Sequence, residues 1–136
     1  MIELISIMVI LGIIGSIVVS RLVDDPSESI ATREVIKSHI RYAQIMAMKS
    51  NRVCGIGFNS NTYFIFRNNS ISDKISLPGN DGIDFPIPSS LGTASETIYF
   101  DLWGIPYTSN ALTTPRPTGA IGSLGIIMTI DTGFLQ

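Results

Sequence analysis

Residues 1–21 read MIELISIMVILGIIGSIVVSR, and this stretch decides how the rest of the chain is organised. Positions 4–20 form an uncharged run of 17 residues, with Glu3 immediately before it and Arg21 immediately after it. Runs of about 18 or more apolar residues typically span a membrane, whereas runs of about 10–14 typically form core helices. Length alone leaves both interpretations open. A carboxylate beside such a run is costly in lipid, so Glu3 is a candidate functional residue that needs a partner.

A cleaved secretory signal is a third interpretation of this segment. Such a signal carries a positive charge before its apolar core and a cleavage site of small residues after it. Here the residue before the core is the acidic Glu3, and residues 21–25 (RLVDD) contain no such site. We therefore expect residues 1–25 to be retained as a hydrophobic N-terminal helix that anchors a globular domain over residues 26–136.

The composition sets limits on the function of that domain. Charged residues make up 15% of the chain, against about 25% in an average soluble protein. The net charge of −2 argues against a surface that binds nucleic acid over its whole extent, although a local basic patch remains open. Cys54 is the single cysteine, so no disulfide can form within the chain, and we expect it to be a buried, inert strand residue.

A second helix is predicted from about residue 26 to residue 51. Asp25 as the N-cap, Pro26 at the first helical position and Glu28 at the third form a capping pattern. Pro26 also disfavours helical geometry at the residue before it, so we expect one long helix that is interrupted near residues 24–26. Gly12 and Gly15 weaken the apolar half by about 1 kcal/mol each relative to alanine.

The second helix has an apolar face, which predicts that it packs on a core. His39, the only histidine, has no metal-binding or catalytic residues near it in the sequence, so we interpret it as structural. The face itself is Ile36, Ile40, Ala43 and Ala47, which we expect Val35, His39, Tyr42 and Met46 to widen.

Arg33, Lys37 and Arg41 follow one another at intervals of four residues and form a row on another side of this helix. The simpler interpretation of the row is a solvated face. The alternative is a basic strip that binds anionic partners or acidic residues of a neighbouring subunit.

Beyond residue 51 the pattern changes from helical to extended. Residues 53–58 and 62–67 flank a short polar turn and predict a β-hairpin. Helix first and strands later predicts an α+β fold, in which the second half of the long helix packs on an antiparallel sheet. Further strands are expected at residues 75–77, at 83–87 on an edge of the sheet because of Pro86, at 97–100, at 124–130 and at 132–135, with a loop at 107–122.

The N-terminus resembles that of type IV pilins and type II secretion pseudopilins, on the sequence Ile2-Glu3-Leu4-Ile5 and the glycine-punctuated apolar run behind it. The resemblance implies a pilin-like fold and a precursor in the bacterial inner membrane. It also implies a prepilin peptidase that cuts after a glycine, and an N-methylated first residue. The glutamate of the family stands two residues later in the chain, so we expect two residues, typically Phe-Thr, to precede Met1.

Three later motifs follow the order of the minor-pseudopilin H and FimT-like group. They are the sequence RYAQ at 41–44, the sequence FDLWGIP at 100–106 and the sequence IDTG at 130–133. The second matches the Phe-Asp-x-x-Gly-x-Pro turn of that group through Phe100, Asp101, Gly104 and Pro106. We interpret it as structural, because aspartate binds backbone amides two residues on, glycine allows a positive φ and proline ends strand pairing. We expect Trp103 to cover the sheet.

The function implied by the resemblance is a structural subunit of a pilus-like filament or a secretion pseudopilus, outside the cell or in the periplasm. Its partners would be copies of itself or other pilins, with Glu3 paired to the N-terminal amine of a neighbour. In the family, the stretch that corresponds to Gly12, Gly15 and Pro26 can lose helical structure within the filament.

The alternative is a minor pilin that binds DNA or a secreted substrate through Arg33, Lys37, Arg41 or the loop at 107–122. The FimT branch associates DNA uptake with basic residues near the C-terminus, yet this chain has no Arg or Lys after Arg116.

Enzymatic and metal-binding functions have less support in the sequence. Residues 80–84 (NDGID) carry two carboxylates, too few by themselves for a calcium ion that takes about six to eight oxygens. Motifs for nucleotide binding, for a catalytic triad or for zinc are absent from the sequence. We therefore expect neither catalysis, nor a metal, nor a cofactor.

Overall fold

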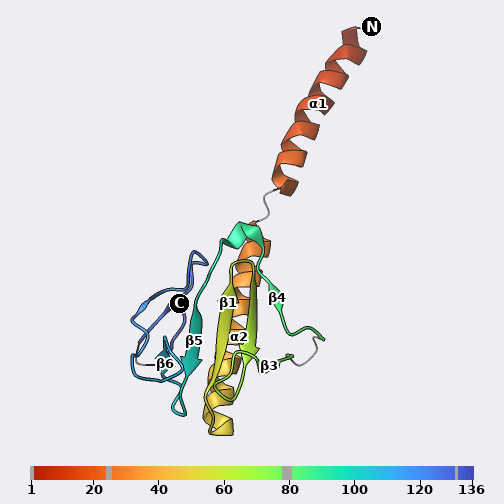
Figure 1. The fold of residues 1–136 in the computed structure, drawn as a ribbon. Coiled ribbons are helices and arrows are strands. Elements are labelled where there is room, and N and C mark those ends of the chain that lie inside the picture. The colour runs from red at the N-terminus through yellow and green to blue at the C-terminus, as the bar shows by residue number, and fades with distance from the viewer. Residues whose placement is uncertain (1, 24–25, 78–80, 131) are drawn as a thin grey trace.

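The computed structural model describes residues 2–23, 26–77, 81–130 and 132–136, with helical side chains described from 4 to 16 and from 29 onward (Figure 1). The chain is α+β, with helices first and an antiparallel sheet after them. The elements are α1 (Ile2–Val23), α2 (Pro26–Ser50), β1 (Cys54–Asn59), β2 (Thr62–Phe66), β3 (Lys74–Ile75), β4 (Phe85–Pro86), the short 3₁₀ helix η1 (Ser89–Leu91), β5 (Thr97–Phe100), β6 (Pro106–Tyr107), β7 (Gly119–Ala120) and β8 (Ile127–Met128).

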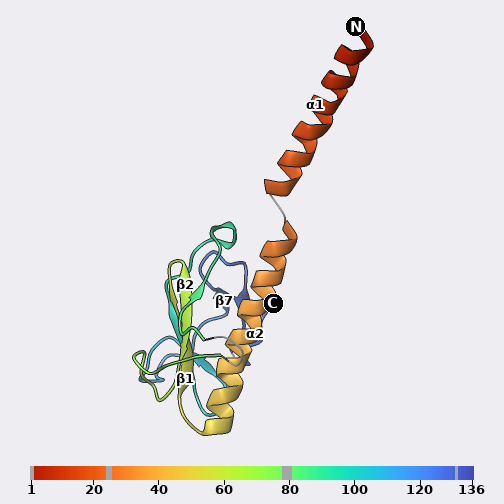
Figure 2. The same cartoon turned by 90° about the vertical axis from the view of Figure 1, so that its right-hand side faces the viewer.

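Helix α2 packs on one face of the sheet, chiefly against β1, as the side view in Figure 2 shows. The predicted apolar face is confirmed, because its four residues, Ile36 to Ala47, are all at most 1% exposed. Val35 is a correction: it is 47% exposed rather than part of that face. It lies about 110° around the helix from the centre of the face. Tyr42 and Met46, also off-centre, are partly buried against the core.

The sheet runs in the order β3-β2-β1-β5-β6, and β4 pairs with β2 beside β3. The predicted hairpin is confirmed as β1 and β2, which pair antiparallel with Gly55 opposite Phe66 and Gly57 opposite Phe64. A Cβ atom at Gly55 or Gly57 would lie 2.6 or 2.4 Å from the Cζ atom of the opposite ring, so only glycine leaves room for both phenylalanines.

These rings form a second apolar cluster on the face of the sheet away from α2. Both faces of the sheet are therefore covered, one by the helix and the other by side chains that follow the strands. The cluster consists of Phe64, Phe66 and Tyr99, with Val53, Tyr107 and Leu112 packed against it.

The C-terminal third differs from the sequence expectation. The long strands expected at 124–130 and 132–135 are absent, and only β8 forms there, paired with β7 in a separate two-stranded sheet. Gly125 and Gly133 have φ values of +68° and +62°, which an extended strand cannot accommodate. Strands β6 and β7 lie in or beside the expected loop at 107–122. The segment still completes the core, since Ile121, Leu124 and Ile126 are fully buried.

Helix α1 extends beyond the end of the sheet in both views, away from the globular part of the chain (Figures 1 and 2). It ends at Val23 and α2 begins at Pro26, and the interruption that the sequence predicts near residues 24–26 falls largely outside the described residues. The capping role expected of Asp25 lies outside the described residues. Helix α1 continues through Gly12 and Gly15.

Among the residues that the structure describes, we find no helix with both the length and the apolar character needed to cross a membrane.

Candidate assembly surface

Helix α1 exposes large apolar side chains on all its sides. Those described from Leu4 to Ile14 are between 52% and 68% exposed, the extremes being Ile14 and Met8. Because consecutive residues 7–11 are all exposed, they cover a complete turn of the helix rather than one face. Within the described ranges, no other element contacts α1. A helix that is apolar all round is normally buried among other apolar groups, so this surface requires a partner.

Helix α1 also contains one acidic residue, Glu3, at its start, and two glycines, Gly12 and Gly15, within the apolar run. Glu3 belongs to the first turn of the helix, where a carboxylate interacts favourably with the helix dipole, but its side chain lies outside the described part. A Cβ atom at Gly12 or Gly15 would meet nothing within 4 Å. The two glycines therefore face open space in the single chain, and neither serves a contact within it.

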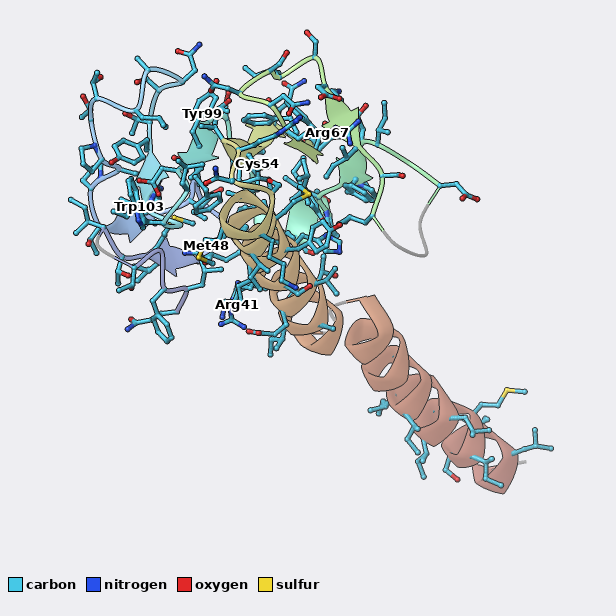
Figure 3. The ribbon with its side chains drawn as sticks, turned by 90° about the horizontal axis from the view of Figure 1, so that it is seen from below. Arg41, Met48, Cys54, Arg67, Tyr99 and Trp103 are labelled. Atoms are coloured by element: carbon cyan, nitrogen blue, oxygen red, sulfur yellow. The ribbon has the colours of Figure 1, made fainter. Side chains whose placement is uncertain are left out.

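The basic row on α2 does not form one open strip. Lys37 is only 14% exposed along its side chain, and its Nζ atom lies 2.8 Å from Oε1 of Glu34. The guanidinium of Arg33 lies against Gly125, and its Nε atom is buried without a hydrogen-bond partner among the described residues. Arg41 is exposed on the side of α2 away from the sheet (Figure 3). The row thus offers a single freely accessible cation.

The turn at residues 100–106 is held by the carboxylate of Asp101, which is 4% exposed. Its Oδ1 atom accepts hydrogen bonds from the backbone amides of Trp103 at 2.9 Å and Ile105 at 2.8 Å. Gly104 has a φ of +81°, as its residue type predicts. Pro106 is a correction: it does not end strand pairing but begins β6, opposite Phe100 of β5.

Gln44 joins this turn to the C-terminal segment, a role that the sequence did not reveal. Its Nε2 atom donates to the carbonyl oxygens of Gly104 and Thr132, both at 2.8 Å. A Cβ atom at Gly104 would lie 3.1 Å from the sulfur of Met48, and one at Gly133 would lie 2.7 Å from Nε2 of Gln44. The two positive-φ glycines thus allow both loops to approach one side of α2, and such glycines are the only sequence signal for the contact.

Trp103 does not cover the sheet, contrary to the expectation, and its side chain is 77% exposed. Val53, Tyr107 and Leu112 pack on the aromatic cluster of the sheet instead. Met48 and Phe134, at 43% and 56% exposure, are among the other exposed apolar residues of the segments that Gln44 joins. Figure 3 places Trp103 and Arg67 on opposite sides of the end of α2.

His39 has a structural partner in the sheet. Its Nδ1 atom lies 2.7 Å from the hydroxyl of Tyr63, and its ring lies 5.5 Å from that of Phe85. Burial lowers the pKa of His39 from its ordinary value of 6.5 and raises the pKa of Tyr63 to about 12. Tyr63 therefore keeps its proton, and its hydroxyl and the neutral imidazole share a hydrogen bond.

Cys54 is fully buried, as predicted, and burial raises the pKa of its thiol. In the loop considered for calcium, Asn80 lies outside the described residues. Oδ1 of Asp84 accepts a 2.6 Å bond from Lys74. In the part of the chain that the structure describes, no three His, Cys, Asp or Glu residues are grouped as metal ligands.

No protein-family model matches this chain, and neither a curated protein nor a solved structure matches it.

Proposed function

We propose that this chain is a structural subunit of a type IV pilus-like filament or a type II secretion pseudopilus, with a pilin-like fold. The observation that carries the proposal is the unpartnered apolar surface of α1, which is exposed on all sides from Leu4 to Ile14. Lipid would cover this surface in the monomer. The same helices of neighbouring copies would cover it after assembly, which leaves the α2–sheet domain on the outside of the filament.

Glu3 selects how the apolar helices pack in this arrangement. A carboxylate among apolar helices needs a positive partner, and in a filament the N-terminal amine of a neighbouring copy supplies it. The pair offsets the desolvation of both groups, whereas one charge left alone in such a core costs about 3–5 kcal/mol. The pairing therefore favours a fixed axial step between copies.

The replacement of Glu3 tests this role. We expect Glu3→Gln to leave the full chain in the membrane fraction but to lower the yield of sheared filaments by about tenfold or more, since each 1.4 kcal/mol is a factor of ten. Filaments are counted by electron microscopy after shearing. The matched control is Glu34→Gln, which removes a carboxylate that is 59% exposed and paired only with Lys37. Equal filament yields from the two variants would contradict the proposal.

The alternative function, a module that binds DNA or a secreted substrate, has less support. Of the basic row on α2, only Arg41 is freely accessible. In the loop at 107–122, Arg116 is 5% exposed, and its guanidinium makes two 3.1 Å bonds with the carboxylate of Glu96. Neither set presents the several free cations that phosphate binding requires.

A further inference from the structure

A shallow groove runs along one side of the C-terminal half of α2. Three adjoining hollows form it, the two larger of about 510 and 480 Å³. Met46 lines all three hollows, and Tyr42 lines the two larger ones. Arg67 lines both the 480 Å³ hollow and the smallest one. The first hollow has a mainly apolar lining, the second a mainly polar one, and the third a mixture of both. The floor of the groove also includes Ile45, Ile75 and Ile83.

The rim of this groove is basic. Lys49 has no carboxylate partner among the described residues, and the guanidinium of Arg52 donates to the neutral Oδ1 of Asn68 at 2.8 Å. Two positive charges are therefore available to an occupant. The other two rim cations are already paired, Arg67 with Asp73 at 3.2 Å and Lys74 with Asp84 at 2.6 Å.

The chemistry of the groove favours an acidic segment that also carries apolar side chains. Single-stranded nucleic acid would need aromatic platforms for its bases, and the floor offers one tyrosine among isoleucines and a methionine. The chain itself contains a segment of the right kind. Residues 22–28 read LVDDPSE, which places three carboxylates beside two apolar residues without a cation.

The distribution of charge along the chain agrees with this match. Residues 1–28 contain one Arg and four acidic residues, for a net charge of −3. Residues 29–136 contain eight basic and seven acidic residues, for a net charge of +1, and the two parts sum to the −2 of the whole chain. The negative charge is thus concentrated at the N-terminal end of α2, and the free rim cations lie at its C-terminal end.

A single copy cannot bring the two together. Helix α2 begins at Pro26, and Lys49 follows 23 residues later, which places it about 35 Å away at 1.5 Å per residue. Figure 1 shows the two ends of α2 at opposite ends of the domain. A contact between the acidic segment and the groove must join two copies, each giving one segment and receiving another. Such a head-to-tail contact builds a helical fibre when its rotation does not close a ring, as the proposed filament requires.

We propose that the groove lined by Tyr42, Met46, Lys49, Arg52 and Arg67 receives residues 22–28 of a neighbouring copy. This inference rests on the proposed filament function and adds the contact that sets the axial order of the globular domains.

Cross-linking within filaments of the full chain tests the contact. We expect the double variant Asp25→Cys with Lys49→Cys, treated with a short bis-maleimide, to give a ladder of covalent multimers on a denaturing gel, because every copy carries both halves of the contact. The matched control is Asp25→Cys with Trp103→Cys, which places the second thiol on the opposite side of the end of α2 (Figure 3). Cys54 is buried and common to all variants.

Charge reversal gives a second, independent measurement. We expect Lys49→Glu with Arg52→Glu to lower filament yield by about tenfold, because like charges then face each other across the contact. Asp24→Lys with Asp25→Lys should lower it similarly. All four substitutions in one chain should restore most of the yield.

The outcomes separate the contact from the filament itself. Filaments that form normally but give a ladder only with the Trp103→Cys control, or no rescue by the fourfold variant, would overturn the inference and leave the filament function intact. Normal assembly of the Lys49→Glu, Arg52→Glu variant together with lost retention of a DNA oligonucleotide would overturn it in favour of nucleic acid. No filaments from the unmodified chain would overturn both proposals.

Discussion

At the scale of single residues, the Asp101 carboxylate holds the turn between β5 and β6. One oxygen atom accepts two backbone amides, and the side chain is almost fully buried. We expect Asp101→Ala to lower the free energy of unfolding by about 1–3 kcal/mol, because two buried donors lose their acceptor. Asp101→Asn keeps one oxygen and should cost less. Urea denaturation measures both changes.

The control for this prediction is Asp81→Ala, which removes an exposed carboxylate that forms no ion pair among the described residues. Equal losses for Asp101→Ala and Asp81→Ala would show that the turn does not depend on the buried oxygen.

Trp103, two residues after Asp101, has an exposure that could not be predicted from the local sequence. The sequence pattern correctly gave the turn, because the bonds of Asp101 and the positive φ of Gly104 are local. Tyr107 and Leu112 instead pack on the aromatic cluster of the sheet, from positions that no local pattern connects to it. A large apolar residue is buried only where no other side chain already fills the space.

At the scale of elements, the contact between His39 of α2 and Tyr63 of β2 makes the packing of helix on sheet dependent on pH. Because burial lowers the pKa of His39 below 6.5, the unfolded chain binds more protons than the folded chain as the pH falls through that value. The contribution of neutral His39 to the free energy of unfolding is therefore fully present above about pH 6.5 and is lost as the pH falls below it. We expect the melting temperature to fall from neutral to mildly acidic pH.

The variant His39→Gln identifies the group responsible, since glutamine retains a polar partner for Tyr63 without titrating. Between neutral and mildly acidic pH, the melting temperature of this variant should fall much less than that of the unmodified chain. Circular dichroism at matched ionic strength measures both. An unchanged pH profile in His39→Gln would assign the effect to other groups.

The elements themselves were predictable where one short pattern dictates them. The apolar period of α2, the β1–β2 hairpin and β5 all follow from local residue patterns, and the structure has them at nearly the expected positions. The two-residue strands β6, β7 and β8 do not follow from local patterns, because each is defined by its pairing with another segment. The apolar surface of α1 was likewise visible in the sequence. The basic groove was not, because its residues come from α2, β1, β3 and several loops.

At the scale of the whole molecule, the fold and the candidate assembly surface belong to different parts of the chain. The main core cluster begins at Ile36 and ends at Leu135, and none of the α1 residues with described side chains, 4–16, belongs to it. We therefore expect the stability of the globular part not to depend on α1. In the proposed filament, the exposed apolar surface of α1 would instead determine how copies of the chain associate.

This separation predicts the behaviour of a fragment that begins at residue 26. We expect it to unfold cooperatively at the same temperature as the full chain in detergent, because the removed residues make no contact with the core in the described ranges. Without detergent the fragment should be monomeric and the full chain associated, as judged by size-exclusion chromatography with light scattering. A fragment that fails to fold, or a full chain that stays monomeric without detergent, would show that α1 stabilises its own domain instead of joining copies.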